Sequence, residues 1–381
     1  MKQLKVLTGI CLVTTALVIC FNRLDIHGVV QLNHKDGQEE RVYQIKTYNQ
    51  QGHQQYDQRH TESTTDKGQP LSTLHPDLQN TKVHHLDKGQ IFDSYNMMSV
   101  NVFTKCSLNS SWTLDQSICK DVPVFKSVKM RTKAGLVDIY IHDPRKDTWV
   151  SATLSRSGTW EQNTTELISS VLRAERDAVL LDIGANIGVY TLTAAKLGFK
   201  VIAVEPLKIN VQRICKSLRA GNFTENVTVV RSALSNVLQK VNLGIVINNI
   251  GGSYVLQGKN INKAKSTLVR GKYPDVIWTT RLDDIMQLPA FDSGKVIIKM
   301  DVEGYENKVL SGGVHFFDRM DVPTVLMEWT YHRKAMSGKE ILTFFENRNY
   351  IAYAPVKNIQ LDLKRSYEWP ADILWKKRKT P

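Results

Sequence analysis

The chain has 381 residues, of which 42% are hydrophobic and 23% are charged. This composition provides enough apolar residues for a packed core and excludes a fully disordered chain. A formal net charge of +13 favours an anionic partner, such as a nucleic acid, a membrane surface or an acidic polymer. No motif interleaves basic with aromatic side chains, so we expect no nucleic-acid partner.

An uncharged, mostly apolar segment follows the first lysines of the chain. Residues 6–21 are short for a membrane span and also fit the core of a signal peptide. Small residues suited to cleavage are scarce at the end of this segment, so we favour an uncleaved signal anchor over residues 6–22. Lys2 and Lys5 precede it, which predicts a cytosolic tail over residues 1–5 and a single-pass type II protein with a lumenal remainder in the Golgi or ER membrane.

The segment after the anchor is polar and shows no sustained hydrophobic period. Gln, His, Asn, Lys and Thr dominate it, so it lacks the apolar surface that would offset its chain entropy. We therefore predict a disordered stem over residues 23–90. Seven of the ten histidines lie between His27 and His85, and we interpret them as solvated residues rather than metal ligands.

Cysteines and glycosylation sequons suit a lumenal protein. Cys106 and Cys119 lie in a predicted N-terminal subdomain, residues 91–134, and their short spacing predicts a disulfide in an oxidising compartment. Cys215 shares one face of a predicted helix with apolar residues, so we expect a buried free thiol there. The sequons occur at Asn109, Asn163, Asn222 and Asn226.

A buried strand that ends in a glycine turn dominates the middle of the chain. We expect a leading strand over residues 136–142 and a helix over residues 165–174 before it. The run from Val179 to Asp182 is short and apolar, which is typical of a buried parallel strand. Gly184 and Gly188 would then allow a tight turn, and the following helix would direct its N–H groups toward a ligand.

A second strand, residues 200–205, ends in an acid beside this turn. In a doubly wound sheet, the carboxylate of Glu205 would accept hydrogen bonds from both hydroxyls of a ribose. A nicotinamide-type Rossmann unit is the rival interpretation, but the spacing here is D-x-G-x-N-x-G rather than G-x-G-x-x-G. The pairing of the turn with Glu205 therefore favours an adenosine-containing ligand.

A third strand, residues 296–300, runs into the acidic turn Asp301–Glu306. At this point six stretches, in this order and spacing, resemble the FkbM family of S-adenosylmethionine-dependent O-methyltransferases over roughly residues 135–355. The stretches are Asp182–Gly188, Glu205-Pro206, Asn210, Asn226–Ser235, Thr280–Asp284 and Lys299–Gly304.

The resemblance implies an α/β fold, a doubly wound seven-strand Rossmann-like sheet of the class I methyltransferase type, over residues 135–375. The residues after it, 376–381, are basic, and we expect them to form a solvated tail. It implies S-adenosylmethionine as the methyl donor, with Glu205 on the ribose and the Ser232-Ala233 pair on the adenine. The donor-binding residues that we predict are Asp182, Gly184, Asn186, Gly188, Glu205, Asn210, Ser232 and Ala233.

Three residues are candidates for the general base that removes the acceptor's proton. Asp301 and Glu303 follow the third strand directly and lead, and His332 is the alternative. Asp301 and Glu328 are alternatively suited to hold Mg²⁺, because strand-end carboxylates are hard oxygen ligands. Lys299 is either an ion-pair partner or a catalytic group.

The resemblance also narrows the acceptor, since the family's known acceptors include hydroxyls of polyketides and of sugars. A lumenal enzyme meets glycans, so we expect a sugar hydroxyl on a glycoprotein or glycolipid. Methylation of a lipid or small secreted metabolite, or a catalytically silent glycan-binding module, are the alternatives. We expect the excursion over residues 240–294 to govern acceptor selectivity. Trp329 and Tyr331 either form an apolar platform for a sugar or belong to the core. The particular sugar and the oligomeric state stay open.

Overall fold

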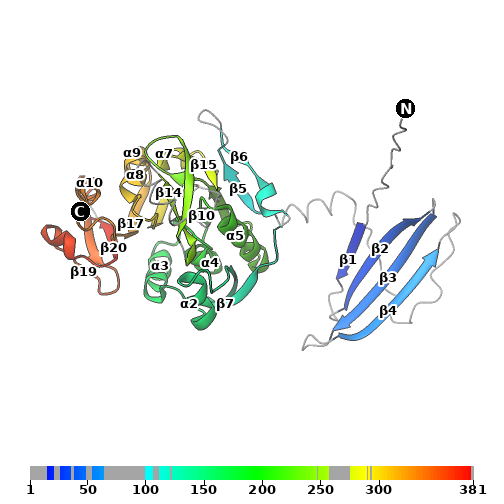
Figure 1. Cartoon of the computed structure of the whole chain (residues 1–381). Coiled ribbons are helices and arrows are strands. Elements are labelled where there is room, and N and C mark those ends of the chain that lie inside the picture. Colours follow the sequence, from blue (N-terminus) through cyan, green and yellow to red (C-terminus); the bar gives the residue numbers. More distant parts are fainter. Residues whose placement is uncertain are drawn as a thin grey trace, which may run out of the picture. The chain divides into compact units, whose positions relative to one another are not determined.

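The structure is a computed structural model, which divides the chain into two units, Met1–His85 and Leu86–Pro381 (Figure 1). The described residues of the first unit are 15–20, 26–35, 38–48 and 54–63. Those of the second unit are 99–105, 111–120, 122–246, 248–256, 275–289, 291 and 294–378. Within these ranges, no helix has both the length and the apolar content that a membrane crossing requires.

The described part of the first unit is an antiparallel sheet whose four strands follow the chain order. They are β1 (Thr15–Cys20), β2 (Ile26–Lys35), β3 (Gln38–Tyr48) and β4 (Gln54–Ser63). The sequence predicts a helix over residues 6–22 and no regular structure over residues 23–90, so the strands differ from both predictions. Backbone pairing with neighbouring strands accounts for the difference, since such hydrogen bonds do not require a local apolar period. The rest of the predicted anchor and stem lies outside the described residues.

A ten-stranded mixed sheet forms the centre of the second unit, in the order β19-β18-β20-β17-β16-β9-β10-β11-β5-β6. Its strands are β5 (Asn101–Thr104), β6 (Thr113–Leu114), β9 (Val179–Ile183), β10 (Val201–Val204), β11 (Val227–Arg231), β16 (Lys295–Met300), β17 (Asp321–Glu328), β18 (Tyr350–Ala354), β19 (Ile359–Gln360) and β20 (Asp372–Lys377). The strands from β5 to β17 in this order run parallel, and β20 and β6 pair antiparallel with their neighbours. The order confirms the predicted doubly wound fold, from β11 to β18, with three further strands.

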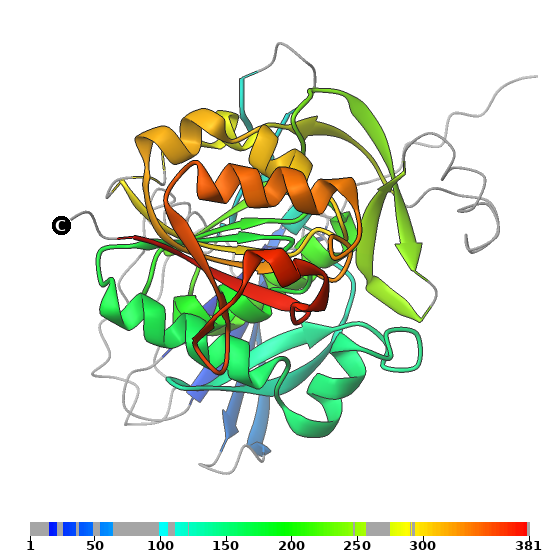
Figure 2. The same cartoon turned by 90° about the vertical axis from the view of Figure 1, so that its left-hand side faces the viewer.

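The chain reverses its direction of winding between β9 and β16, and parallel sheets bind ligands at such a switch point. Helices cover both faces of the sheet, with α3 on one and α10 on the other (Figure 2). Neighbouring residues of β9 show the two faces, because Leu180 packs into one core and Leu181 into the other. The helices are η2 (Gln116–Cys119), α2 (Val150–Ser157), α3 (Gln162–Ala174), α4 (Val189–Lys196), α5 (Lys208–Gly221), α7 (Leu282–Ile285), α8 (Glu306–Ser311), α9 (Val314–Arg319), α10 (Met336–Glu346) and η3 (Leu363–Glu368).

A second sheet, in the order β12-β15-β13-β14, is formed by strands that lie between β11 and β16 in the sequence. Its strands are β12 (Ala233–Leu234), β13 (Lys240–Val246), β14 (Asn249–Leu256) and β15 (Val276–Thr280). The β13–β14 hairpin contacts the segment before α2, where the Thr148 N–H donates to the Asn248 carbonyl oxygen at 2.8 Å. The remaining pair, β7 (Lys126–Thr132) and β8 (Gly135–Ile141), forms a separate hairpin.

The disulfide joins Cys119 to Cys215, with 5.7 Å between their Cα atoms, and the predicted pairing of Cys119 with Cys106 is wrong. The prediction of a free thiol at Cys215 is corrected with it. Helix η2 packs against α5, and this contact brings together cysteines that lie 96 residues apart in sequence. Spacing along the chain carries no information on such a contact. Cys106 lies outside the described residues.

The C-terminal segment is also more ordered than predicted. Strand β20 inserts between β17 and β18, so Lys376 pairs with Thr324 and Ile351 instead of belonging to a solvated tail. Among the predicted sequons, Asn163 and Asn222 are exposed and Asn226 is partly buried. Asn109 lies outside the described residues.

Candidate active site

A turn in the left-handed region joins β9 to α4. Gly184 and Gly188 have φ values of 81° and 95°, and Asn186 between them has a φ of 52°. A Cβ atom on Gly184 would lie 1.8 Å from the carbonyl oxygen of Asp301, so only glycine fits there. The turn after β9 therefore packs directly against the turn after β16, as a binding site shared by both strands requires.

A cavity of about 520 Å³ opens beside these turns, at the carboxyl ends of the central strands. The predicted site residues that line it are Gly184, Asn186, Glu205, Ser232, Ala233, Asp301, Glu303 and Glu328. The remaining predicted residues, Asp182, Gly188, Asn210 and His332, do not line it. The structure thus gathers most of the candidates and separates direct wall residues from supporting ones.

Glu205 is 2% exposed and accepts hydrogen bonds on both carboxylate oxygens. Its Oε2 accepts from the Asn186 N–H at 2.8 Å, and its Oε1 accepts from the Leu207 N–H at 2.9 Å. Burial raises the pKa of Glu205 to about 8, although the hydrogen bonds that it accepts oppose the rise. The carboxyl group is therefore held in one orientation at the wall of the cavity.

Asn210 and His142 continue this network away from the cavity. The Asn210 Nδ2 donates to Glu205 Oε1 at 3.1 Å, and its Oδ1 lies 2.7 Å from His142 Nε2. Burial, followed by the charge of Arg213, lowers the pKa of His142 to about 4, so the imidazole is neutral and its Nε2–H donates to Asn210. Asn210 thus orients Glu205 rather than facing the cavity, and sequence reasoning did not assign a role to His142.

Asp182 connects β9 to helix α4 from inside the protein. It is fully buried, and its Oδ2 accepts from the Thr191 N–H at 3.0 Å and from the Thr191 hydroxyl at 2.6 Å. Burial raises the pKa of Asp182. The side chain therefore caps the first turn of α4 and supports the glycine turn.

Two further residues with polar side chains, Ser232 and Asn186, line the cavity. The Ser232 hydroxyl donates to the Trp278 carbonyl oxygen at 3.0 Å, so this side chain is already engaged with the second sheet. The Oδ1 of Asn186, in contrast, is buried beside the cavity without a hydrogen-bond partner. An unsatisfied acceptor of this kind suits a ligand that brings its own donor.

Lys299 and Asp301 form an ion pair at the end of β16, with 3.4 Å between Nζ and Oδ2. Burial by itself would lower the pKa of Lys299, but the carboxylates of Asp301 and Asp182 hold it above its usual value. The Asp301 side chain is 35% exposed, whereas that of Lys299 is 9% exposed. Asp301 is consequently the more accessible of the two at the cavity, and Lys299 acts as its charge partner.

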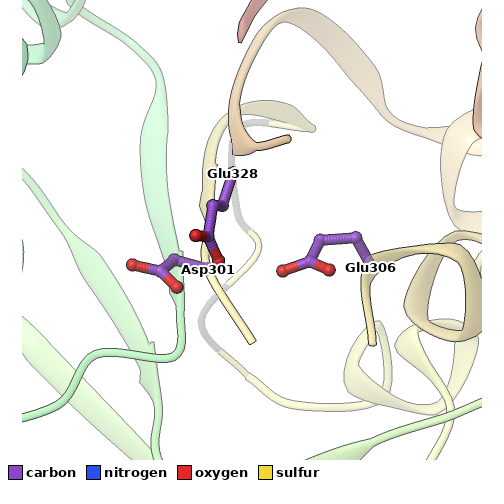
Figure 3. A group of neighbouring side chains, drawn as sticks. All are labelled: Asp301, Glu306 and Glu328. Atoms are coloured by element: carbon purple, nitrogen blue, oxygen red, sulfur yellow. The ribbon is translucent and has the colours of Figure 1, made fainter. Parts of the chain in front are cut away.

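Three carboxylates converge next to this pair. One oxygen from each of Asp301, Glu306 and Glu328 lies within 4.8 Å of the others, and Figure 3 shows Glu306 directed toward the other two. Burial, followed by the charge of Asp301, raises the pKa of Glu328 to about 9. The Oε2 of Glu328 is buried without a hydrogen-bond partner. Glu306 joins the predicted pair of metal ligands, although its own oxygens already accept from the Val302 N–H and contact His332.

His332 does not face the cavity, which corrects its prediction as an alternative base. It is 1% exposed, and its Nε2 lies 2.6 Å from Glu306 Oε2 while its Nδ1 lies 2.7 Å from Ser337 Oγ. Both ring nitrogens are therefore occupied by internal partners, so this histidine positions Glu306.

The two aromatic candidates take opposite roles. Trp329 is fully buried and packs against Trp369, with 5.1 Å between ring centroids, so it belongs to the core. Tyr331 is 52% exposed, lines the cavity and donates its hydroxyl hydrogen to Glu303 Oε2 at 2.7 Å. Burial raises the pKa of Glu303.

Several wall residues were missed by sequence reasoning. They come from the segments around α2 and α3, from α4 and from the β14 hairpin, and are Trp149, Trp160, Glu161, Tyr190 and Tyr254. The Tyr190 hydroxyl donates to Glu161 Oε2 at 2.7 Å, and desolvation raises the pKa of Glu161. The left-handed φ of 44° at Glu161 is unusual for a residue other than glycine, but no sequence motif predicts it.

Part of the chain is similar to a known protein family. Residues 182–352, less than half of the sequence, match the family model of the Methyltransferase FkbM domain. No curated protein matches the chain.

Among solved structures, a TehB-like SAM-dependent methyltransferase from Corynebacterium glutamicum is 12% identical, with a TM-score of 0.33, and the match covers 60% of this chain and 94% of that one. A SAM-dependent methyltransferase from Agrobacterium tumefaciens is 10% identical, with a TM-score of 0.28 and coverage of 62% and 61%. The match to the family model, together with the sheet order and the cavity at its switch point, supports a methyltransferase family for the domain that contains residues 182–352.

Proposed function

We propose that this chain is an S-adenosylmethionine-dependent O-methyltransferase. The observation that carries the proposal is the buried carboxylate of Glu205, held beside the Gly184 turn in the same cavity as Asp301. The turn admits no side chain at Gly184, and the unpaired Oδ1 of Asn186 offers an acceptor to the donor molecule. These features fit an adenosine-containing ligand, whose ribose hydroxyls would donate to Glu205.

The bound donor would supply an electrophilic methyl group on a sulfonium centre. The residues of this chain place the acceptor hydroxyl in line with that group and take up its proton, and placement is the larger requirement. We assign the proton to the Asp301 carboxylate, because its side chain is 35% exposed and lines the cavity. Glu303 already accepts a hydrogen bond from Tyr331.

A divalent metal ion is the alternative role for the same acids. Asp301 and Glu328, joined by Glu306, present oxygen ligands of the type that Mg²⁺ prefers. In that case, Asp301 would hold the ion that binds the acceptor oxygen instead of accepting the proton itself.

For the acceptor, we propose a sugar hydroxyl on a glycoprotein or glycolipid in the lumen of the Golgi or ER. The Cys119–Cys215 disulfide supports an oxidising compartment, and the sequons at Asn163 and Asn222 lie on exposed positions. Methylation of a lipid or small secreted metabolite is the second candidate, and a silent glycan-binding module is the third.

Transfer of an isotope-labelled methyl group tests the activity. The full chain is incubated with labelled donor and with a panel of glycans or a lipid extract, and mass spectrometry locates the label. Label on a glycan hydroxyl supports the proposal, whereas label only in the lipid extract favours the second candidate. Glycan binding without donor binding by calorimetry would favour the silent module.

Asp301→Asn separates catalysis from binding. We expect turnover to fall by about 10²-fold with little change in donor affinity, because the carboxylate acts in the transition state. Asp138→Asn is the matched control, since Asp138 also pairs with a lysine and its side chain is also 35% exposed, but it does not line the cavity. Loss of activity with a chelator, restored by Mg²⁺, supports the metal role, and unchanged activity supports the base. Normal turnover in folded Asp301→Asn would exclude both roles.

Protease protection in sealed microsomes tests the location. A lumenal chain resists added protease until detergent opens the vesicles, and endoglycosidase lowers its apparent mass. Digestion of the second unit in intact vesicles would contradict the lumenal assignment.

A further inference from the structure

Five acidic side chains line the cavity, although the chain as a whole is basic. Its acidic wall residues are Glu161, Glu205, Asp301, Glu303 and Glu328. Among the described residues that line the cavity, Lys299 is the sole cation, although the chain has a formal net charge of +13. The wall is therefore acidic where an acceptor would have to enter.

Lys299 offers no free charge to an acidic acceptor. Its Nζ lies 3.4 Å from Asp301 Oδ2, 3.5 Å from the Gly184 carbonyl oxygen and 5.0 Å from the centroid of the Tyr190 ring. Its side chain is only 9% exposed. A carboxylate, sulfate or phosphate group on the acceptor would have to compete with Asp301 for this ammonium group and would face the other acids unpaired.

The remaining acceptor wall combines aromatic rings with hydrogen-bond acceptors. Trp149 and Tyr331 line the cavity and are 63% and 52% exposed, so their rings are available to a ligand. Glu303 accepts a hydrogen bond from the Tyr331 hydroxyl, and Glu161 accepts one from the Tyr190 hydroxyl. Aromatic faces pack against the C–H faces of a sugar, and carboxylates accept hydrogen bonds from its hydroxyl groups.

We propose that the acceptor site selects an uncharged sugar, whose hydroxyl groups donate to Glu161 and Glu303 between the Trp149 and Tyr331 rings, and that it rejects acidic sugars. This inference rests on the proposed methyltransferase function and specifies its substrate class. Binding of the methyl donor by itself does not require the site to distinguish uncharged from acidic acceptors.

Repulsion between like charges sets the expected size of the effect. Two like charges about 6 Å apart, at an effective dielectric constant of about 20, weaken binding by about a hundredfold, and solvent screening reduces this figure. We expect a preference of at least about tenfold for the neutral acceptor.

The test compares two acceptors that differ only in charge, using the full chain. Calorimetry with S-adenosylmethionine first establishes donor binding, so that failure of the proposed function is seen separately from failure of this inference. Transfer to a methyl hexoside is then compared with transfer to the hexuronoside of the same configuration and to the corresponding amino sugar. At least about tenfold higher kcat/KM for the hexoside supports the inference, whereas equal or faster transfer to the hexuronoside, or preferential transfer to the amino nitrogen, overturns it.

A pair of variants tests whether Glu161 contributes to the preference for the neutral acceptor. Glu161→Gln removes one negative charge from the cavity and should bring the hexoside-to-hexuronoside ratio closer to one by about threefold or more. Glu166→Gln is the control, because Glu166 lies on the same helix region but pairs with Lys133 outside the cavity. If the ratio stays at the wild-type value in Glu161→Gln, Glu161 does not face the acceptor and the inference is overturned.

Discussion

At the scale of single residues, the proposed donor site contains one carboxyl group, that of Glu205, that is buried deeply enough to resist ionisation. Glu205 accepts hydrogen bonds from two backbone N–H groups and from Asn210, yet burial still raises its pKa to about 8. At pH values above the pKa of a glutamate in the unfolded chain, keeping this carboxyl group buried at the proposed donor site therefore lowers the stability of the fold. Functional sites commonly combine ligand affinity with such a cost.

The pKa of Glu205 predicts a pH-dependent stability. An ordinary glutamate in the unfolded chain releases its proton near pH 4.5, whereas the folded chain keeps it until about pH 8. The folded state therefore binds more protons in this window, and its free energy of unfolding decreases as the pH rises from about 4.5 to 8. At about 1.4 kcal/mol per pKa unit, the loss amounts to several kcal/mol at most.

Urea unfolding of the donor-free chain at pH 5 and pH 8 measures this loss. Glu205→Gln cannot ionise, so the decline between the two pH values should be smaller in this variant than in the wild type. Glu225→Gln, at an exposed position, should retain the wild-type decline. Identical pH dependence in all three proteins would show that Glu205 is ionised in the folded state throughout.

His142 provides a second residue-scale prediction. His142→Phe removes the donor to Asn210 Oδ1, so Asn210 no longer fixes the Glu205 carboxyl group, and we expect donor affinity to fall by about tenfold. His142→Gln can restore a donor at this position and should recover much of the affinity. His315→Phe is the control at an exposed histidine.

Calorimetry gives the donor affinity of these variants, and thermal unfolding reports their stability separately. A loss of stability in His142→Phe with unchanged donor affinity would mean that the network supports only the core.

At the scale of elements, two turns from distant parts of the chain interlock to form the site. The turn after β9 lies against the backbone of the turn after β16, where the Asp301 N–H donates to the Ile183 carbonyl oxygen at 2.9 Å. Gly184 makes this approach feasible, because any Cβ would overlap the Asp301 carbonyl oxygen. The same backbone contact thus positions the residues proposed to bind the methyl donor and those proposed to act on the methyl acceptor.

Gly184→Ala tests this contact against a matched glycine. Gly184 and Gly198 have similar φ values, 81° and 88°, but a Cβ on Gly198 would meet no atom within 4 Å. Gly198→Ala should cost only the left-handed strain, about 1–2 kcal/mol. Gly184→Ala adds a backbone overlap and should cost about 2–5 kcal/mol and weaken donor binding. Equal losses in the free energy of unfolding would indicate that the two turns are not in contact.

At the scale of the whole molecule, the disulfide links the edge of the large sheet to a helix that covers one face. Cys119 lies in η2 and Cys215 in α5, and Arg219 donates to the Cys119 carbonyl oxygen at 2.6 Å in the same contact. The cross-link thereby joins the segment before the methyltransferase core to the core itself.

Replacing both cysteines by serine should lower the free energy of unfolding by about 2–5 kcal/mol, because the cross-link closes a long loop of the unfolded chain. Urea unfolding with and without reductant measures the effect, and the double variant should be insensitive to reductant. Peptide mapping without reduction gives an independent check. A peptide that joins Cys119 to Cys106 would contradict the pairing in the structure.

Local sequence patterns determined the fold class and predicted the residues of the proposed donor half of the site. Short apolar runs predict the buried strands that became β9, β10 and β16, because parallel strands covered on both faces leave no polar alternation. Glycine at positions 184 and 188 and the acid at position 205 follow these strands directly, and parallel strands end at one edge of the sheet. Residues tied to strand ends are therefore predictable from the sequence.

Contacts between distant segments were decided only by the tertiary structure. Three features depend on how helices and loops pack on the sheet. They are the disulfide partner of Cys119, the buried position of His332, and the place of Trp149 and Glu161 in the cavity wall. No local period or spacing encodes these contacts, since each joins residues that the chain order separates. The strand at the C-terminus is the same case, because β20 is held by two neighbours rather than by its own basic sequence.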